Sequence, residues 1–310
     1  MNQHQPRRPK ADDAAAVYAL ISARDTAVIG RPDMTFDDVV DELSEFDLER
    51  DCWLWETADG TVLTYCWVHR KADSDMVDFE VIERPGTEGE RTDQAWSLVL
   101  RRAAELGEEV GHQSVTADIG IFRADGPKQA LAASKGFEAS TSFHRLRVDH
   151  EKPVTAPELP AGVTLHTGVT DEVRRQAYDV HQKGFAEHFG FVPVTFEEWF
   201  SRRDAQSTTD WSQVTVARVD GEPAAVLIGT DHFVSDENCG YVITLATLPD
   251  YRGRGLGRLL LRTAFAADAE RGRTGTILHV DANNTTPALG LYESVGMRPV
   301  MVFDMWRKRL

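Results

Sequence analysis

The chain has 310 residues, of which 34 are Lys or Arg and 50 are Asp or Glu, so its formal net charge is −16 with histidine neutral. Such an acidic protein is poorly suited to neutralising nucleic-acid phosphates or an anionic membrane surface, and we expect neither as a partner. Because we find neither a long apolar run nor a signal-peptide pattern, we expect a cytoplasmic protein. The 3 cysteines lack the spacing of a zinc knuckle, so we expect no metal site.

The first half of the chain predicts an alternation of helices and strands. Apolar residues recur at helical spacing in some stretches, and β-branched or aromatic runs lie between them. In chain order we predict a helix at 12–23, a hairpin at 53–67 around Asp59-Gly60, a strand at 77–82, a helix over 95–103, a further strand, a short helix ending at Gly136-Phe137 and a last strand.

A proline-rich segment near the midpoint predicts a division between two domains. Residues 151–160 contain prolines at 153, 157 and 160, which disfavour a helix and donate no backbone hydrogen bond. We therefore predict a first domain at 1–150, a linker at 151–160 and a second domain at 161–310.

The second half repeats the order of the first. Its predicted elements are a helix at 171–185, a hairpin at 214–228 around Asp220-Gly221, a strand at 241–248, a helix from Leu256, a further strand, a short helix ending at Gly296-Met297 and a last strand. Because helices and strands mix within each half, the fold class is α/β or α+β. The shared order indicates that one unit occurs twice.

The segment between the third strand and the long helix of the second half predicts a ligand site. From residue 249 it reads Pro-Asp-Tyr-Arg-Gly-Arg-Gly-Leu-Gly-Arg. Its three glycines allow a tight turn that brings backbone N–H groups close to a ligand. The start of a helix, together with Arg252, Arg254 and Arg258, favours an anion. The spacing is neither that of a Walker loop nor that of the dinucleotide fingerprint, so the segment predicts a different kind of phosphate cradle.

This loop resembles the acetyl-CoA pyrophosphate loop of the GCN5-related N-acetyltransferase (GNAT) family, written Pro-x-x-Arg/Gln-x-x-Gly-x-Gly/Ala. A second stretch, residues 280–297, resembles the family's strand–helix segment, which carries an Asn and a Leu-Tyr-Glu-x-x-Gly-Phe run. The resemblance implies two tandem GNAT acyl-CoA N-acyltransferase folds, each a mixed central sheet flanked by helices. It also implies an acetyltransferase that uses acetyl-CoA as co-substrate and no metal.

The resemblance further implies roles for individual residues. Leu245, Ala246 and Thr247 would form the strand that a bulge splays to receive the pantetheine arm. Asn284 would contact that arm, or would cap the helix that follows. Tyr292 would be the general acid that protonates the departing thiolate, or a packed aromatic on a helix face. The residues implied to hold the pyrophosphate are Arg252, Gly253, Arg254, Gly255, Leu256, Gly257 and Arg258.

The first half lacks the features that carry this resemblance. In the place of the glycine-rich loop it has 83–93, which is acidic and would repel a pyrophosphate. Ala132 stands where the second half has Tyr292, and Ala124 where it has Asn284. We therefore predict that the first domain is degenerate, does not catalyse, and supports the second.

The acceptor and the catalytic base stay open at this point. We expect a small-molecule primary amine as acceptor and a monomer or homodimer as the assembly. The base candidates are Asp231, His232, Glu237, Glu187 and His188. Aromatic residues near the last two, Phe185, Phe189, Phe191 and Trp199, would wall an acceptor pocket or pack in the core.

The two-domain organisation resembles that of GNAT enzymes of the mycothiol synthase type. Two positions depart from that type: Tyr241 stands where an acidic residue begins the CoA strand, and His279 where a substrate-binding tyrosine precedes the Asn. The alternatives are therefore acetylation of a cysteinyl pseudodisaccharide, a longer acyl-CoA donor, or a non-catalytic CoA-binding regulatory protein.

Overall fold

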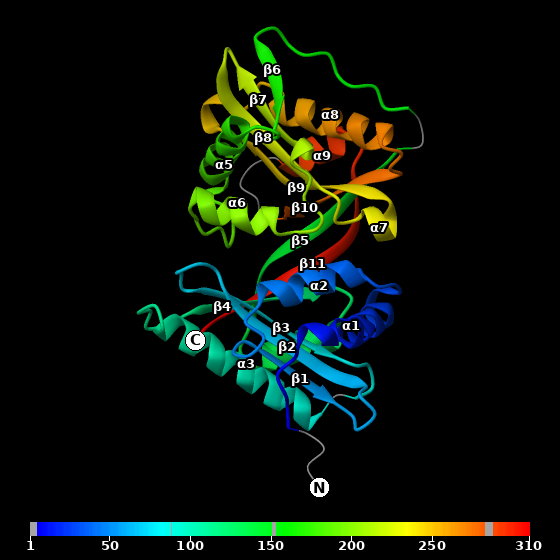
Figure 1. Ribbon diagram of the computed structural model, residues 1–310, viewed down its shortest axis with the longest axis vertical. Helices are drawn as coiled ribbons and strands as arrows, with labels where there is room; N and C mark the ends of the chain where they lie inside the picture. Colours follow the sequence, from blue (N-terminus) through cyan, green and yellow to red (C-terminus); the bar gives the residue numbers. More distant parts are fainter. Residues whose placement is uncertain (1–4, 88, 151–152, 283–287) are drawn as a thin grey trace. The chain divides into compact units, whose positions relative to one another are not determined.

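The computed structural model describes residues 5–87, 89–150, 153–282 and 288–310. The chain forms two compact units: unit 1 comprises Met1–Thr141 and Phe303–Leu310, and unit 2 comprises Ser142–Val302 (Figure 1). This division differs from the predicted one because residues 142–149 pair with a strand of unit 2 and residues 303–309 pair with a strand of unit 1.

Unit 1 contains a mixed sheet with the strand order β1-β2-β3-β4-β11. These strands are β1 (Cys52–Glu56), β2 (Val62–Arg70), β3 (Met76–Glu83), β4 (Thr116–Phe122) and the end of β11 (Arg298–Arg309). β3 and β4 run parallel but pair only from Met76 to Asp78 on β3. β11 pairs antiparallel with β4, from Phe303 opposite Phe122 to Arg309 opposite Thr116.

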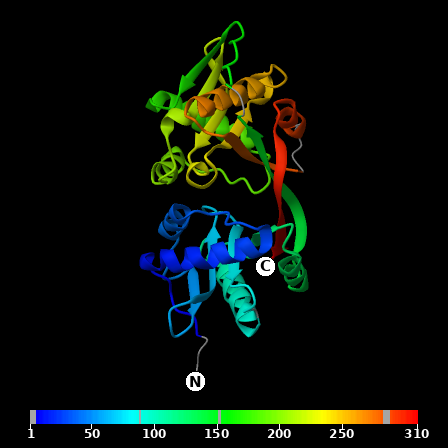
Figure 2. The same cartoon turned by 90° about the vertical axis from the view of Figure 1, so that its right-hand side faces the viewer.

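Helices cover both faces of the unit 1 sheet, as Figures 1 and 2 show. They are η1 (Ala11–Asp13), α1 (Ala14–Ile29), α2 (Phe36–Glu45), α3 (Glu90–Glu108) and α4 (Gly126–Ser134). α3 and α4 bury Trp96 and Ala132 on one face, and α1 and α2 bury Leu20 and Val39 on the other. The helix α2 was not among the predicted elements; it begins with a capping box between Thr35 and Asp38.

Unit 2 repeats this plan with the strand order β5-β10-β9-β8-β7-β6. Its strands are β5 (Glu138–Asp149, of which residues 142–149 belong here), β6 (Val163–Thr167), β7 (Val214–Val219), β8 (Glu222–Thr230), β9 (Cys239–Thr247) and β10 (Gly275–Asp281). β9 and β10 form the parallel pair, and the other recorded pairs are antiparallel. The predicted order of elements in the second half is therefore confirmed.

The helices of unit 2 likewise form two layers around the sheet. They are α5 (Asp171–Phe185), α6 (Phe196–Asp204), η2 (Trp211–Gln213), α7 (Val234–Glu237), η3 (Pro249–Tyr251), α8 (Leu256–Glu270) and α9 (Ala288–Ser294). α8 and α9 pack on one face through Leu260 and Tyr292. α5 and α6 pack on the other face through Ala177 and Trp199.

The two predicted hairpins form with different turns. Asp220 (φ +50°) and Gly221 (φ +91°) make a two-residue connection between β7 and β8. In unit 1 the connection is longer, because pairing ends at Glu56 opposite Val62. Within the described residues, no helix is long and apolar enough to span a bilayer, and no three metal-binding side chains gather.

Candidate active site

The strands β9 and β10 open away from each other in unit 2. They pair only from Cys239 to Val242 on β9, although both strands continue beyond that point. On its other side β9 stays paired with β8, with an irregularity that places Thr244 opposite Ile228 and Val242 opposite Gly229. In the described chain, the edge of residues 243–247 that faces β10 therefore has no strand partner. These residues include Leu245, Ala246 and Thr247, and their backbone groups on that edge are available to an extended ligand.

The glycine-rich loop follows directly and leads into α8. Gly253 (φ +76°) and Gly255 (φ +78°) both adopt the left-handed conformation, with open space where a side chain would project. The first intrahelical bond is donated by Leu259 to the carbonyl of Gly255. The N–H groups of the preceding turn therefore have no intrahelical acceptor and favour an anion at this helix start.

Arginines surround the same helix start. Arg252 and Arg254 are exposed, Arg252 donates to the Thr247 carbonyl at 3.3 Å, and Arg254 stacks over the Tyr251 ring at 5.2 Å. Arg258 is exposed one turn into the helix and donates to Ser294 at 3.0 Å. These arginines, the left-handed glycines and the open N–H groups fit a pyrophosphate, the group that the sequence predicted here.

The helix after β10 holds the predicted acid. Tyr292 lies on α9 within the apolar cluster under α8 and is 8% exposed. Burial raises the pKa of its phenol to about 12, so the hydroxyl stays protonated at neutral pH. Its neighbour Leu291 approaches Gly257 so closely that a side chain there would lie 3.0 Å from Leu291 Cδ2. Asn284 lies outside the described residues.

Tyr241 and His279 lie together on the face of the sheet that α5 covers. The Tyr241 hydroxyl and His279 Nδ1 are 2.8 Å apart, and Arg145 Nε donates to His279 Nε2 at 3.0 Å. Burial, reinforced by Arg145, lowers the pKa of His279 to about 3, and burial raises that of Tyr241 to about 12. Both side chains are therefore uncharged over the physiological pH range.

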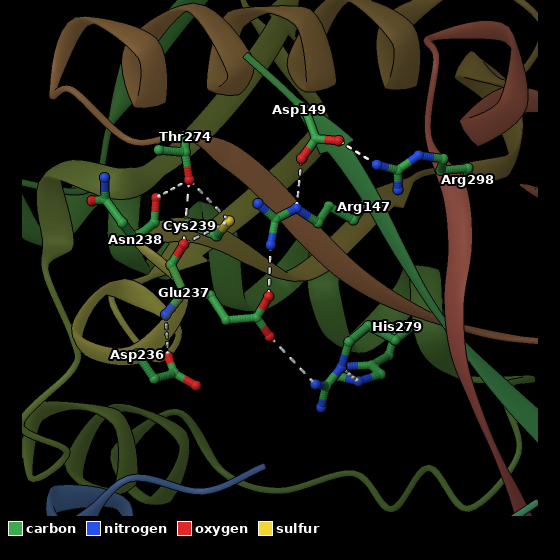
Figure 3. A network of polar contacts seen from close by, with 10 residues as sticks. Arg147, Asp149, Asp236, Glu237, Asn238, Cys239, Thr274, His279 and Arg298 are labelled. Atoms are coloured by element: carbon green, nitrogen blue, oxygen red, sulfur yellow. Dashed lines mark hydrogen bonds and ion pairs between the residues drawn. The ribbon is translucent and has the colours of Figure 1, made fainter. Parts of the chain in front are cut away.

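A network of ions continues from this pair (Figure 3). Arg147 donates to Glu237 at 2.6 Å and to Asp149 at 2.7 Å, and Asp149 also binds Arg298. Glu237 also lies 3.8 Å from Arg145, so its carboxylate lies between two arginines. Asp231 is similarly engaged, by Arg273 and by Gln213 at 2.7 Å.

The remaining base candidates are in different surroundings. His232 packs edge-on against Phe233, 4.5 Å between ring centroids, and lies 5.7 Å from the ring of Tyr241. Glu187 is exposed, whereas His188 is half-buried and stacks on Phe185 at 4.2 Å. Burial lowers the pKa of His188. Arg252 lowers this pKa further, whereas Asp281 opposes the shift, so the imidazole interacts electrostatically with both the loop and the end of β10.

The predicted aromatic wall is divided between two environments. Trp199 is 4% exposed in the core cluster beneath α5 and α6. Phe185 and Phe191 group with His181, and Phe189 meets Phe143 at 6.4 Å. Core packing therefore accounts for Trp199.

Comparison with known proteins shows a similarity to one family. Residues 173–297 match the sequence model of the acetyltransferase (GNAT) family. The matched residues lie within unit 2. The match covers α5, the β9–β10 opening, the glycine-rich loop and α9.

Named relatives match this chain over part of their length. A mycothiol acetyltransferase of Thermobispora bispora is 31% identical over 186 residues, which are 57% of this chain and 61% of the relative. One from Renibacterium salmoninarum is 27% identical, over 54% of this chain and 51% of the relative. The matches thus span about half to three fifths of those relatives.

Solved structures share the fold over the whole chain. A GNAT protein of Sphaerobacter thermophilus has a TM-score of 0.81 at 24% identity and covers 100% of this chain and 96% of its own. A tandem GNAT protein from the clavulanic acid biosynthesis pathway has a TM-score of 0.72 at 17% identity and covers 98% and 97%. The predicted pair of tandem GNAT folds is confirmed.

Sequence reasoning missed Arg145 and Arg147. Both lie on β5, which the sequence places in the first half, yet they pair opposite His279 and Ile277 of β10. No local motif marks them, because their roles depend on a strand pairing that joins residues far apart in the chain.

Proposed function

We propose that unit 2 transfers an acetyl group from acetyl-CoA to the primary amine of a small molecule by direct attack. The observation that carries this proposal is the opening between β9 and β10, which ends at the left-handed Gly253–Gly255 turn and the start of α8. Acetyl-CoA would supply the acetyl group as an activated thioester.

Each part of the site has a distinct task in this proposal. The loop from Arg252 to Arg258 holds the pyrophosphate, and the unpaired edge of Leu245–Thr247 binds the pantetheine arm in the manner of an added strand. The acceptor nitrogen attacks the carbonyl carbon, the carbon–sulfur bond breaks, and Tyr292 donates its proton to the leaving sulfur. The amine releases a proton in turn, so the phenol is restored. Holding both reactants in place supplies much of the rate.

The test is a CoA-release assay with acetyl-CoA and a panel of small amines, aminoglycosides, polyamines and peptides. We expect Tyr292→Phe to lower kcat about a hundredfold or more while leaving acetyl-CoA affinity within about twofold, because one proton donor is lost and the aromatic packing is kept. Calorimetry measures the affinity. Tight acetyl-CoA binding without release to any amine would instead favour a non-catalytic CoA-binding protein.

The mycothiol precursor is the second candidate acceptor. The name shared by the relatives favours it. Tyr241 and His279 are the positions at which this chain departs from that type, so the precursor belongs in the amine panel as a separate test. A kcat/KM for the precursor well above that of simple amines would select it.

We also propose that unit 1 does not bind acetyl-CoA. Its β3–α3 connection also contains glycines with positive φ, Gly86 (+78°) and Gly89 (+141°), but acidic residues flank them: Glu83, which accepts from Thr92 at 2.5 Å, and Glu90. Ala132 occupies a fully buried place on α4. We expect one acetyl-CoA per chain in a calorimetric titration. Two equivalents per chain would contradict this assignment.

A further inference from the structure

Two hydrogen bonds determine where His279 carries its proton. The Nε–H of Arg145 can only donate, so His279 Nε2, 3.0 Å away, must accept. In a neutral imidazole the other nitrogen then carries the hydrogen. His279 Nδ1–H therefore donates to the Tyr241 oxygen at 2.8 Å.

This direction decides what the Tyr241 hydroxyl can do. Its oxygen accepts from His279, so its own hydrogen must be donated to a different partner. Among the described residues, His279 is the hydrogen-bond partner recorded for this hydroxyl. The ring is positioned by Phe233 at 5.1 Å and His232 at 5.7 Å between centroids, and the side chain is half-buried rather than sealed in the core.

The position of Tyr241 places this donor beside the proposed reaction site. Tyr241 pairs with Ile277 within the short stretch where β9 and β10 are joined, next to the point where they separate. On β9 it lies on the face that also carries Ala246, which packs toward α5. This is the face opposite α8, on which Phe185 of the expected acceptor wall also packs, so we assign it as the acceptor side of the strand.

We propose that Arg145, His279 and Tyr241 form a one-way hydrogen-bond relay, and that its terminal hydroxyl selects amines whose amine-bearing carbon also carries a carboxamide or carboxylate group. The inference rests on the proposed acetyl transfer and adds the class of acceptor. A chain of donors that starts at a cation polarises each successive bond toward an oxygen acceptor. The relay thus ends in a donor, and the amine loses its proton elsewhere.

The charges around the relay agree with this direction. Glu237 lies 2.6 Å from Arg147 but 3.8 Å from Arg145, so its closer ion pair is with Arg147. Arg145 stacks over the Phe233 ring at 4.5 Å, which holds the guanidinium plane while its Nε–H points to His279. The lowered pKa of His279 and the raised pKa of Tyr241 keep both groups neutral, as the relay requires.

The first experiment needs no substrate. In ¹⁵N-histidine NMR spectra of the full chain, with the His279 signals assigned through His279→Asn, we expect a neutral ring protonated at Nδ1 at pH 7. Arg145→Met should weaken this preference and populate the Nε2–H form, because the obligatory donor is gone. Arg147→Met is the matched control: it removes an arginine on the same strand that also binds Glu237, and should leave the tautomer unchanged. An Nε2–H tautomer or an imidazolium in the wild type would overturn the relay.

The second experiment measures acceptor choice with alaninamide and isopropylamine, which differ in a carboxamide or methyl next to the amine-bearing carbon. We expect Tyr241→Phe to lower kcat/KM about tenfold for alaninamide and less than about twofold for isopropylamine, because one hydrogen bond to oxygen is lost. Tyr65→Phe, a buried phenol of unit 1, should change neither ratio.

The outcomes separate the two proposals. An equal fall for both amines in Tyr241→Phe overturns oxygen selection, because the substitution then acts on the shared chemistry or on packing. Absence of CoA release with every amine overturns the proposed function, whereas the tautomer measurement still decides the relay.

Discussion

At the scale of single residues, one carboxyl group that is buried without a hydrogen-bond partner among the described residues lowers the stability of the fold. Glu42 lies on α2 of unit 1, and its Oε1 has no hydrogen-bond partner in the described chain. Burial, reinforced by Glu80, Glu45 and Asp38 and opposed by Arg24, raises the pKa of this carboxyl to about 8. The folded protein therefore keeps a proton that the unfolded chain has lost by neutral pH.

This raised pKa predicts a pH-dependent cost. The folded pKa lies above the unfolded value of 4.5, so stability decreases as pH rises between the two and the loss is complete above about 8. We expect Glu42→Gln to stabilise unit 1 by about 3 kcal/mol at pH 7 and by little at pH 4, because a neutral amide has no such cost. Urea unfolding at both pH values measures this difference. A gain of equal size at both would show that ionisation is not the cause.

Packing against a neighbouring helix explains why a glycine occupies position 240. A side chain at Gly240 on β9 would lie 2.1 Å from Asp268 Oδ2. Asp268 is 5% exposed and cannot easily move, because it accepts from Thr276 and, at 2.7 Å, from Arg273. Gly240 is therefore required by a contact with α8 rather than by its backbone conformation.

At the scale of elements, α8 has a left-handed glycine at each end but a proposed ligand at only one. Gly255 (φ +78°) precedes the helix and Gly272 (φ +77°) follows it, and both have open space around the missing side chain. Alanine at either place destabilises the fold by a similar backbone strain, of about 1 kcal/mol. The two positions thus form a matched pair that separates strain from ligand binding.

We expect Gly255→Ala to weaken acetyl-CoA binding about tenfold or more, because it disturbs the turn that aims N–H groups at the pyrophosphate. Gly272→Ala should lower stability to a similar extent while changing the affinity less than about twofold. Calorimetric titration and thermal unfolding of both variants test this. Equal losses of affinity would mean that the loop is not the pyrophosphate site.

At the scale of the whole molecule, the last strand in the sequence completes the first unit. Residues 303–309 of β11 pair with β4, and Arg307 binds the buried Asp118 through two bonds of 2.7 Å. Asp118 is 1% exposed, so removal of Arg307 would leave a buried carboxylate without its main partner.

We therefore expect a chain ending at Val302 to lose cooperative unfolding of unit 1 while unit 2 still unfolds cooperatively. The truncated chain keeps Trp53, Trp55, Trp67 and Trp96 in unit 1 and Trp199 and Trp211 in unit 2, so tryptophan fluorescence in urea reports on both units. Arg309→Ala is the control: it removes an exposed ion pair with Asp75 and should change stability by no more than about 0.5 kcal/mol. Unchanged unfolding of the truncated chain would contradict the role of β11.

Local patterns account for the parts that could be predicted. The hairpin at Asp220-Gly221, the apolar stripe of α8 and the glycine-rich loop each depend on neighbours in sequence, and the structure contains all three. The helices α2 and α6 were not predicted. The apolar residues of α2 do lie at helical spacing, whereas α6 lies in an aromatic-rich stretch whose spacing allows several interpretations.

The sequence by itself determined the tandem repeat, the α/β class and the proposed phosphate loop, because each is written in residues that are close together in the chain. Only the tertiary structure decided which residues share a unit and which surround Tyr241. Arg145 reaches His279 through the pairing of β5 with β10, and such a contact between distant segments leaves no local trace. The same physical reason explains why Tyr292 could be proposed as the acid from the sequence, whereas the proposed relay could not.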